Sequence, residues 1–161
     1  MEAIIELKSI GEVRIVEGVF SLQLKDDYRK ALIGVQGFSH LNVLWWAHYL
    51  DQPEMRAVLT SEKPYKKGPQ TLGIFATRSP LRPNPICLSV VSVMQIDPEQ
   101  GKILIPYIDA EDRSPILDIK PYHPSTDRVR EALVPDWCRH WPESLEDSAI
   151  FDWEAEFENA S

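Results

Sequence analysis

Two arginines and an amide side chain stand close together in residues 77–84, where the sequence has its densest potential for ligand binding. Arg78 and Arg82 each carry a planar fork of N–H donors that suits a carboxylate or a phosphate. Asn84 adds a further hydrogen-bonding group. Loops near strand ends often carry binding sites, so the segment is a candidate site for an anionic ligand.

The same loop contains three prolines, which are Pro80, Pro83 and Pro85. Each proline fixes its own φ and biases the residue before it toward an extended conformation. The loop therefore loses little conformational entropy on ordering, and its side chains are held in place before a ligand arrives. The residue types alone leave open an alternative, a rigid surface turn that carries two solvated arginines.

Other polar residues fall at the ends of predicted strands, namely His48, Asp109, Asp112, Asp118, Lys120 and Tyr122. A lone histidine such as His48 or His40 is more often a packed structural residue than a catalyst. Asp118 also has a structural alternative, a buried ion pair with an arginine. Cys138 and His140 have metal-ligand chemistry but lack a second pair, and we expect no metal site.

Hydrophobic periodicity indicates short strands on both sides of the loop. Strands are predicted over 72–77 and 86–96, and a turn at 97–101 leads to a return strand over 102–110. Residues 41–50 are apolar on both faces, which favours a buried strand over an amphipathic helix.

Further short strands are predicted within 3–24 and over 116–119, and residues 26–32 have helical character. Many short strands with glycine and proline turns, and little helix, are typical of an all-β barrel or sandwich.

The C-terminal segment has a different pattern. Ser144 and Asp147 form a predicted helix N-cap pair, and a helical stripe follows at Leu145, Ala149, Trp153 and Phe157. We therefore predict a barrel domain over 1–134 and an aromatic, acidic helical tail over 135–161 that packs on it.

The formal net charge is −8, and it is unevenly distributed. Residues 140–161 hold seven acids and no Lys or Arg, whereas residues 56–82 hold six basic residues against Glu62. The basic stretch is able to meet phosphates, although a solvated loop with lysines is the more common explanation of such a stretch.

No apolar run reaches the length of a membrane span, and the N-terminus has no signal-type core. We expect a cytoplasmic protein. Cys87 and Cys138 alone do not suggest a disulfide framework.

Three ordered motifs resemble those of the TsaA-like family, also called YaeB or TrmO. The longest is G-I-F-A-T-R-S-P-L-R-P-N-P-I at 73–86, followed by Leu88 and Ser89. A second is D-R-S-P-I-L-D-I-K-P-Y at 112–122, and a third is G-F-S-H-L at 37–41.

The resemblance implies a β-barrel homodimer that binds S-adenosyl-L-methionine (SAM) and methylates an exocyclic adenine nitrogen in tRNA. The implied target is the threonylcarbamoyl-modified adenosine beside the anticodon. Carried over by motif, the cofactor contacts are His48, Tyr49, Arg78, Leu88, Ile108 and Asp109. We assign the substrate to Arg82, Asn84, Asp118 and Lys120, and no residue to the chemical step itself.

Two departures from the family pattern motivate a second hypothesis. Cys87 stands where the family usually has glycine, and the family's Pro/Arg/Gln segment after the first strand has no counterpart between Ile10 and Leu24. The second hypothesis is a non-catalytic module that binds a nucleotide or SAM. A third, a hydrolase that uses Asp109 or Asp112 with His48, has only residue types to support it.

Overall fold

The computed structural model describes residues 5–159, which form two compact units. The first unit comprises residues 5–51 and 85–128. The second comprises residues 52–84 and 129–159, so the predicted tail lies in the same unit as the long connection after Asp51.

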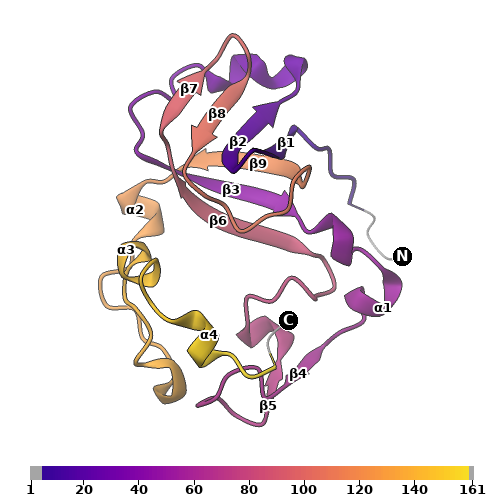
Figure 1. Ribbon diagram of the computed structural model, residues 1–161, viewed down its shortest axis with the longest axis vertical. Helices are drawn as coiled ribbons and strands as arrows, with labels where there is room; N and C mark the ends of the chain where they lie inside the picture. The colour runs from indigo at the N-terminus through magenta and orange to yellow at the C-terminus, as the bar shows by residue number, and fades with distance from the viewer. Residues whose placement is uncertain (1–4, 160–161) are drawn as a thin grey trace. The chain divides into compact units, whose positions relative to one another are not determined.

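In its described part, the first unit is built on a seven-stranded antiparallel sheet in the order β6-β3-β9-β1-β2-β8-β7 (Figure 1). The strands are β1 (Gly11–Val16), β2 (Val19–Leu24), β3 (His40–Trp46), β6 (Ile86–Ser92), β7 (Gln95–Asp97), β8 (Lys102–Ile105) and β9 (Pro115–Pro121). The all-β class predicted from the sequence is confirmed at this level.

The core of the first unit lies on one face of this sheet. Alternate residues of the strands point inward, because successive side chains of a strand face opposite sides. The residues with no exposed surface are Val13, Leu22, Leu41, Val43, Ile103 and Ile116. Sheet pairing therefore brings together apolar side chains from the two ends of the unit's sequence.

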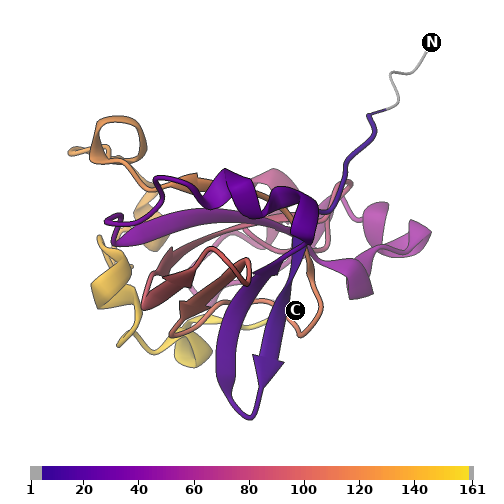
Figure 2. The same cartoon turned by 90° about the horizontal axis from the view of Figure 1, so that it is seen from above.

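The closed barrel expected from the resemblance is not formed, since no ladder joins β6 to β7 within residues 5–159. The predicted strand 86–96 is interrupted at Val93 and Met94, whose N–H groups bond to Ser39 O at 2.8 Å and Leu104 O at 2.9 Å. The chain thereby changes partner from β3 to β8. The two edge strands are thus consecutive in sequence, and Figure 2 shows the β1–β2 hairpin turned steeply from β3.

Two further predicted strands are shorter than expected. The strand predicted over 41–50 ends at Trp46 and is followed by a 3₁₀ helix, His48–Leu50. The return strand predicted over 102–110 ends at Ile105, before Pro106. A 3₁₀ helix at Asp26–Leu32 agrees with the helical character predicted there, and α2 (Pro124–Asp127) follows β9.

The second unit contains short elements. They are α1 (Pro53–Arg56), β4 (Thr60–Glu62), β5 (Thr71–Gly73), 3₁₀ helices at Ile74–Ala76 and Asp136–Cys138, α3 (Leu145–Ser148) and α4 (Trp153–Glu156). The prediction of a strand over 72–77 is wrong beyond Gly73. The chain there forms the 3₁₀ helix Ile74–Ala76, in which Ile74 is buried.

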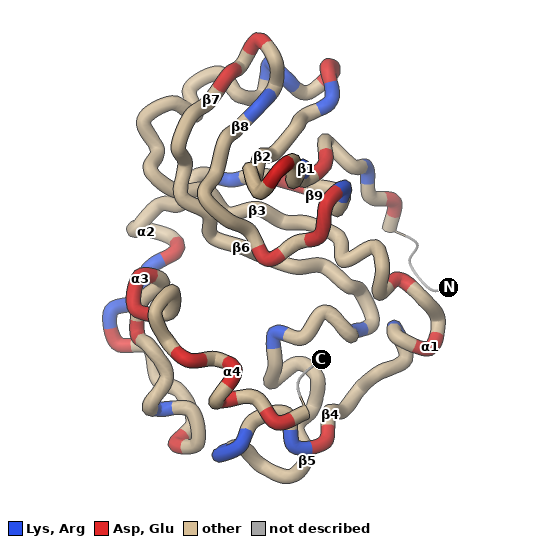
Figure 3. Tube along the Cα trace, in the orientation of Figure 1, with Lys and Arg blue, Asp and Glu red and all other residues tan. Residues whose placement is uncertain are grey.

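The tail forms two separate helical turns rather than one stripe. The Ser144 cap is confirmed, since its Oγ accepts the Asp147 N–H at 3.1 Å. Asp152 starts the second turn by accepting the Ala155 N–H at 3.0 Å. Acidic residues recur along α3 and α4 (Figure 3).

Aromatic side chains form the interior of the second unit. Tyr65, which is 8% exposed, stacks on Trp137 with centroids 5.4 Å apart and meets the edge of Trp141 at 4.9 Å. Trp153 and Phe157 extend the cluster from α4 and the residue after it. The aromatic segment 135–142 thus packs on the loop between β4 and β5.

Within residues 5–159, no helix has the length and apolar character needed to cross a membrane.

Candidate functional site

The arginine-proline loop begins on a buried anchor. Ile74 is 2% exposed, and its N–H donates to Leu59 O at 2.9 Å. Thr77 is also buried, and its Oγ and N–H both donate to Ile74 O, at 2.8 and 3.1 Å. These bonds fix the backbone immediately before Arg78.

Side chains then organise the loop in place of backbone pairing. The Thr77 hydroxyl accepts the Ser79 N–H at 3.3 Å, and the Ser79 hydroxyl accepts the Leu81 N–H at 3.2 Å. Arg82 Nη1 donates to Ser79 O at 3.3 Å, so this guanidinium folds back over its own loop. These hydrogen bonds stabilise the rigid loop that the prolines predicted.

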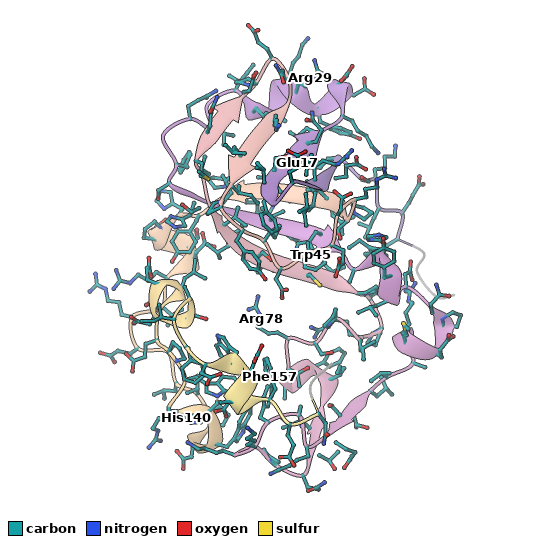
Figure 4. The ribbon with its side chains drawn as sticks, viewed as in Figure 1. Glu17, Arg29, Trp45, Arg78, His140 and Phe157 are labelled. Atoms are coloured by element: carbon teal, nitrogen blue, oxygen red, sulfur yellow. The ribbon has the colours of Figure 1, made fainter. Side chains whose placement is uncertain are left out.

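Arg78 and Asn84 are both exposed side chains of this loop. The Arg78 side chain projects from the loop away from the β4–β5 hairpin (Figure 4). The Asn84 amide oxygen accepts a hydrogen bond from Arg56 Nη2 at 3.1 Å. The second unit thus presents a guanidinium and an amide from one ordered loop.

His48 lies in the first unit, just after β3. Its Nδ1 is buried and has no hydrogen-bond partner among the described residues, which is a costly arrangement for a polar atom. The imidazole packs on Tyr49, with centroids 4.0 Å apart, and Tyr49 is 64% exposed. A buried polar atom without a partner requires an explanation, and a hydrogen bond from a bound ligand is one.

Leu88, Ile108 and Asp109 lie in the same unit. Leu88 lies on β6 opposite Leu44 and is 46% exposed, whereas Ile108 is buried. Asp109 is exposed and accepts a hydrogen bond from the Tyr107 hydroxyl at 3.5 Å. Burial, followed by the charge and hydrogen bond of Asp109, raises the pKa of Tyr107.

Asp118 and Lys120 form an exposed ion pair, with Nζ and Oδ2 2.5 Å apart. The hydrogen bond and the charge of Asp118 raise the pKa of Lys120. The alternative of a buried pair between Asp118 and an arginine is therefore wrong. Asp118 follows a β-bulge, because Leu44 pairs with Asp118 whereas Trp45 pairs with Ile116.

Asp112 has a structural role. Its Oδ1 accepts the Ile15 N–H at 2.7 Å and lies 3.5 Å from Arg14 Nε. The Ile15 hydrogen bond, helped by the charges of Arg14 and Arg113, lowers the pKa of Asp112. Because the Asp112 carboxylate binds the backbone and a side chain of β1, it does not support the hydrolase hypothesis.

His140 also has a structural partner, since its Nε2 lies 2.8 Å from Glu156 Oε2. Among the described residues, no group of three or more His, Cys, Asp or Glu side chains is arranged to hold a metal ion.

The predicted site residues fall into two sets. The first unit contains His48, Tyr49, Leu88, Ile108, Asp109, Asp118 and Lys120, and the second contains Arg78, Arg82 and Asn84. The long motif at 73–86 runs from the second unit into the first, and the division falls between Asn84 and Pro85.

Sequence reasoning missed two residues around the loop. Arg56 contacts Pro83 and Asn84. Arg56 lies in the polar segment after β3, and nothing in the sequence there indicates a contact with Pro83, 27 residues later. Phe75 is 80% exposed on the 3₁₀ turn before Arg78, although the predicted strand gave it no special place. An aromatic residue three positions before Arg78 was the available signal.

Comparisons with known proteins agree with the motifs. The family described as the tRNA-methyltransferase O N-terminal domain matches residues 12–128. An S-adenosyl-L-methionine-binding protein of Archaeoglobus fulgidus is 33% identical over 118 residues, which cover 73% of this chain and 79% of that protein. The tRNA (adenine(37)-N6)-methyltransferase of Escherichia coli is 32% identical, over 76% of this chain and 52% of the enzyme.

The crystal structure of TrmO from Pseudomonas aeruginosa superposes with a TM-score of 0.65 at 27% identity. The match covers 84% of this chain and 62% of that one, so the chain spans less than two thirds of that structure. The resemblance drawn from the three motifs is confirmed. The chain belongs to the tRNA-methyltransferase O N-terminal domain family.

Proposed function

We propose that this chain is a SAM-dependent methyltransferase that acts on tRNA. The proposed acceptor is an exocyclic adenine nitrogen, in the threonylcarbamoyl-modified adenosine beside the anticodon. The observation that carries the proposal is the family match over residues 12–128, which includes the motifs at 73–86 and 112–122. The names of the A. fulgidus and E. coli relatives support the same cofactor and reaction.

The residues present fit SAM chemically. His48 has a buried Nδ1 without a partner among the described residues, which a hydrogen-bonding group of the cofactor would satisfy. Tyr49 and Leu88 present exposed apolar surface suited to the adenine ring or the thioether chain. Asp109 suits ribose hydroxyls or the methionine ammonium, and Arg78 suits the methionine carboxylate.

When bound, SAM supplies a methyl group activated by its sulfonium. The chain's own contribution is alignment, because direct methyl transfer depends on holding donor and acceptor in line. Arg82, ordered through Ser79, and Asn84, ordered through Arg56, would hold the modified base. Lys120, which is paired with Asp118 in the first unit, would also contact the substrate.

Calorimetric titration with SAM tests cofactor binding. We expect saturable binding that Arg78→Ala weakens about tenfold or more, because a charged hydrogen bond to a carboxylate is lost. The matched control is Arg139→Ala, which removes an exposed arginine paired with Asp136 in the tail. Equal affinity of the wild type and Arg78→Ala would remove Arg78 from the site.

Incorporation of labelled methyl groups from SAM into total tRNA tests the reaction. Transfer that depends on the threonylcarbamoyl modification supports the proposed acceptor, whereas transfer to unmodified tRNA points to another adenine. SAM binding without incorporation into any tRNA favours the non-catalytic binding module.

The proposal includes a homodimer, as in the resemblance that led to it. β6 is an edge strand whose Ile86 and Leu88 are 37% and 46% exposed, a surface that pairing with a second copy would cover. Sedimentation equilibrium of the wild type and of Ile86→Lys tests this, and a monomeric wild type would contradict it.

A further inference from the structure

Arg56, the last residue of α1, joins this short helix to the distal end of the arginine-proline loop. Its Nε donates to Pro83 O at 2.8 Å, and its Nη2 donates to Asn84 Oδ1 at 3.1 Å. One guanidinium thus holds a backbone carbonyl and the neighbouring side chain together. This two-point contact uses the fork geometry that distinguishes arginine from lysine.

The backbone of Pro83 and Asn84 lies between two ordered parts of the chain, the hydrogen-bonded turn that ends at Arg82 and the buried Pro85, whose carbonyl accepts the Ala47 N–H at 2.9 Å. Pro83 and Pro85 have no N–H groups, so neither can donate to a neighbouring backbone. The hydrogen bonds that Thr77 and Ser79 make within the loop reach Leu81 and Arg82. Arg56 supplies the contacts for the next two residues.

The chemistry of arginine also decides which way the Asn84 amide points. A guanidinium has only donors, so the Asn84 oxygen must face Arg56. The exposed side chain is then left to meet a ligand with its NH₂ end, which has two donors and no acceptor. The matching ligand group is an acceptor oxygen, and an anionic oxygen would form the strongest hydrogen bonds.

We propose that Arg56 is a positioning residue that turns the Asn84 amide so that its NH₂ group binds an anionic oxygen of the substrate. The inference rests on the proposed function, in which Asn84 contacts the substrate. Two sources of anionic oxygen are available in a modified tRNA, a backbone phosphate and a carboxylate on the modified base. The role of Arg56 is the same for both.

Steady-state methyl transfer at saturating SAM tests the proposal with Arg56→Ala, Arg56→Lys, Asn84→Ala and the double variant. We expect Arg56→Ala to raise the KM for tRNA about tenfold with a smaller change in kcat, as for the loss of one charged hydrogen bond. In the Asn84→Ala background the same change should cost less than about twofold, because its target is gone. Arg56→Lys should restore part of the loss.

Comparing modified with unmodified tRNA distinguishes the two sources. An Arg56→Ala effect confined to modified tRNA assigns the carboxylate, and an equal effect on both assigns a phosphate. An effect as large in the Asn84→Ala background as in the wild type would overturn the proposal. So would an equal loss in the control, Arg139→Ala.

A readout independent of turnover separates this inference from the proposed function. In a ¹⁵N–¹H spectrum, the Asn84 side-chain NH₂ signals are identified by their loss in Asn84→Asp. We expect Arg56→Ala to move them toward the values of a solvated amide, while thermal unfolding shows that the variant is folded. Unmoved signals overturn the positioning role, whereas a wild type that transfers no methyl group overturns only the proposed function.

Discussion

His140 Nε2 donates a hydrogen bond to Glu156 Oε2 across 2.8 Å, and the Glu156 side chain is only 8% exposed. The Trp141 indole nitrogen and Glu156 Oε1 are buried without a geometrically satisfactory hydrogen-bond partner among the described residues. Burial raises the pKa of Glu156, but the hydrogen bond from His140, the nearby Trp141 indole N–H and the charges of His140 and Lys67 outweigh it, so the pKa lies below its ordinary value. The carboxylate therefore connects the aromatic segment to α4.

We predict that His140→Ala destabilises the second unit, because it leaves a buried carboxylate without its main partner. The expected loss in the free energy of unfolding is about 2–4 kcal/mol. Urea unfolding followed by tryptophan fluorescence measures it. Glu154→Ala, an exposed acid two residues from Glu156, is the control and should change stability by less than about 0.5 kcal/mol. Equal effects of the two variants would contradict the role of the pair.

The same carboxylate predicts a dependence of stability on pH. Because its folded-state pKa lies below the ordinary value of 4.5, ionised Glu156 stabilises the fold above that pH. The contribution is lost as the pH falls from 4.5 through the lower, folded-state pKa. Glu156→Gln should remove this part of the acid dependence, as measured by unfolding at a series of pH values. An unchanged profile would mean that other acids control acid unfolding.

Asp112 predicts a similar acid dependence in the first unit. The Ile15 N–H bond is the main cause of its lowered pKa. The ionised Asp112 carboxylate therefore stabilises the fold above pH 3.8, and this contribution is lost as the pH falls below that value. Asp112→Asn retains an acceptor for Ile15 but cannot titrate, so it should flatten the profile with little loss at neutral pH. Asp112→Ala should destabilise at every pH. If both variants behave alike, the hydrogen bond is not the cause.

We predict that a side chain at Gly11 destabilises the pairing of β1 with β2 by steric overlap. A Cβ at this position would overlap the carbonyl oxygen of Gln23 and lie 2.9 Å from Leu24 Cα, both in the backbone of β2. Gly11→Ala should therefore cost at least about 2 kcal/mol of stability. Gly73→Ala is the matched control, since a Cβ there meets nothing within 4 Å. Chemical denaturation of both variants gives the comparison, and equal stabilities would rule out the overlap.

We predict that replacing His48 has opposite effects on stability and on SAM binding. His48→Phe keeps a ring against Tyr49 and removes the buried Nδ1 that has no partner in the described structure, so stability should be unchanged or higher. SAM affinity, if it uses this nitrogen, should fall about tenfold. Thermal unfolding and calorimetry of the same sample measure the two effects. Loss of stability together with affinity would indicate a structural histidine.

The sequence predicted features that depend on local patterns. Alternation in β1, β2 and β8 gave the strands, and the Ser144 and Asp147 pair gave the helix start. The interruption at Val93 and Met94 was not predictable, because the carbonyl groups that accept their N–H groups, those of Ser39 and Leu104, come near only in the folded chain.

The same limit applies to the tail and the candidate site. Glu156 has the sequence context of a solvated acid, and only the folding of the tail brings His140 onto it. The motifs supplied the predicted site residues, which stay a prediction, but they did not indicate the contact of Arg56 with Asn84. Sequence spacing cannot show which of several exposed arginines reaches the loop.

The order of strands in the sheet has a consequence for synthesis on the ribosome. β1 pairs with β9, its neighbour on one side, only after Pro115 and Ile116 have been made, about a hundred residues later. Until then β1 and β2 exist as a hairpin, and the β3–β6 ladder lacks the strand that joins it to that hairpin. Such long-range pairing folds slowly and exposes strand edges in the meantime. The edges of β1 and β3 that pair with β9 therefore stay unpaired until residue 121 has left the exit tunnel.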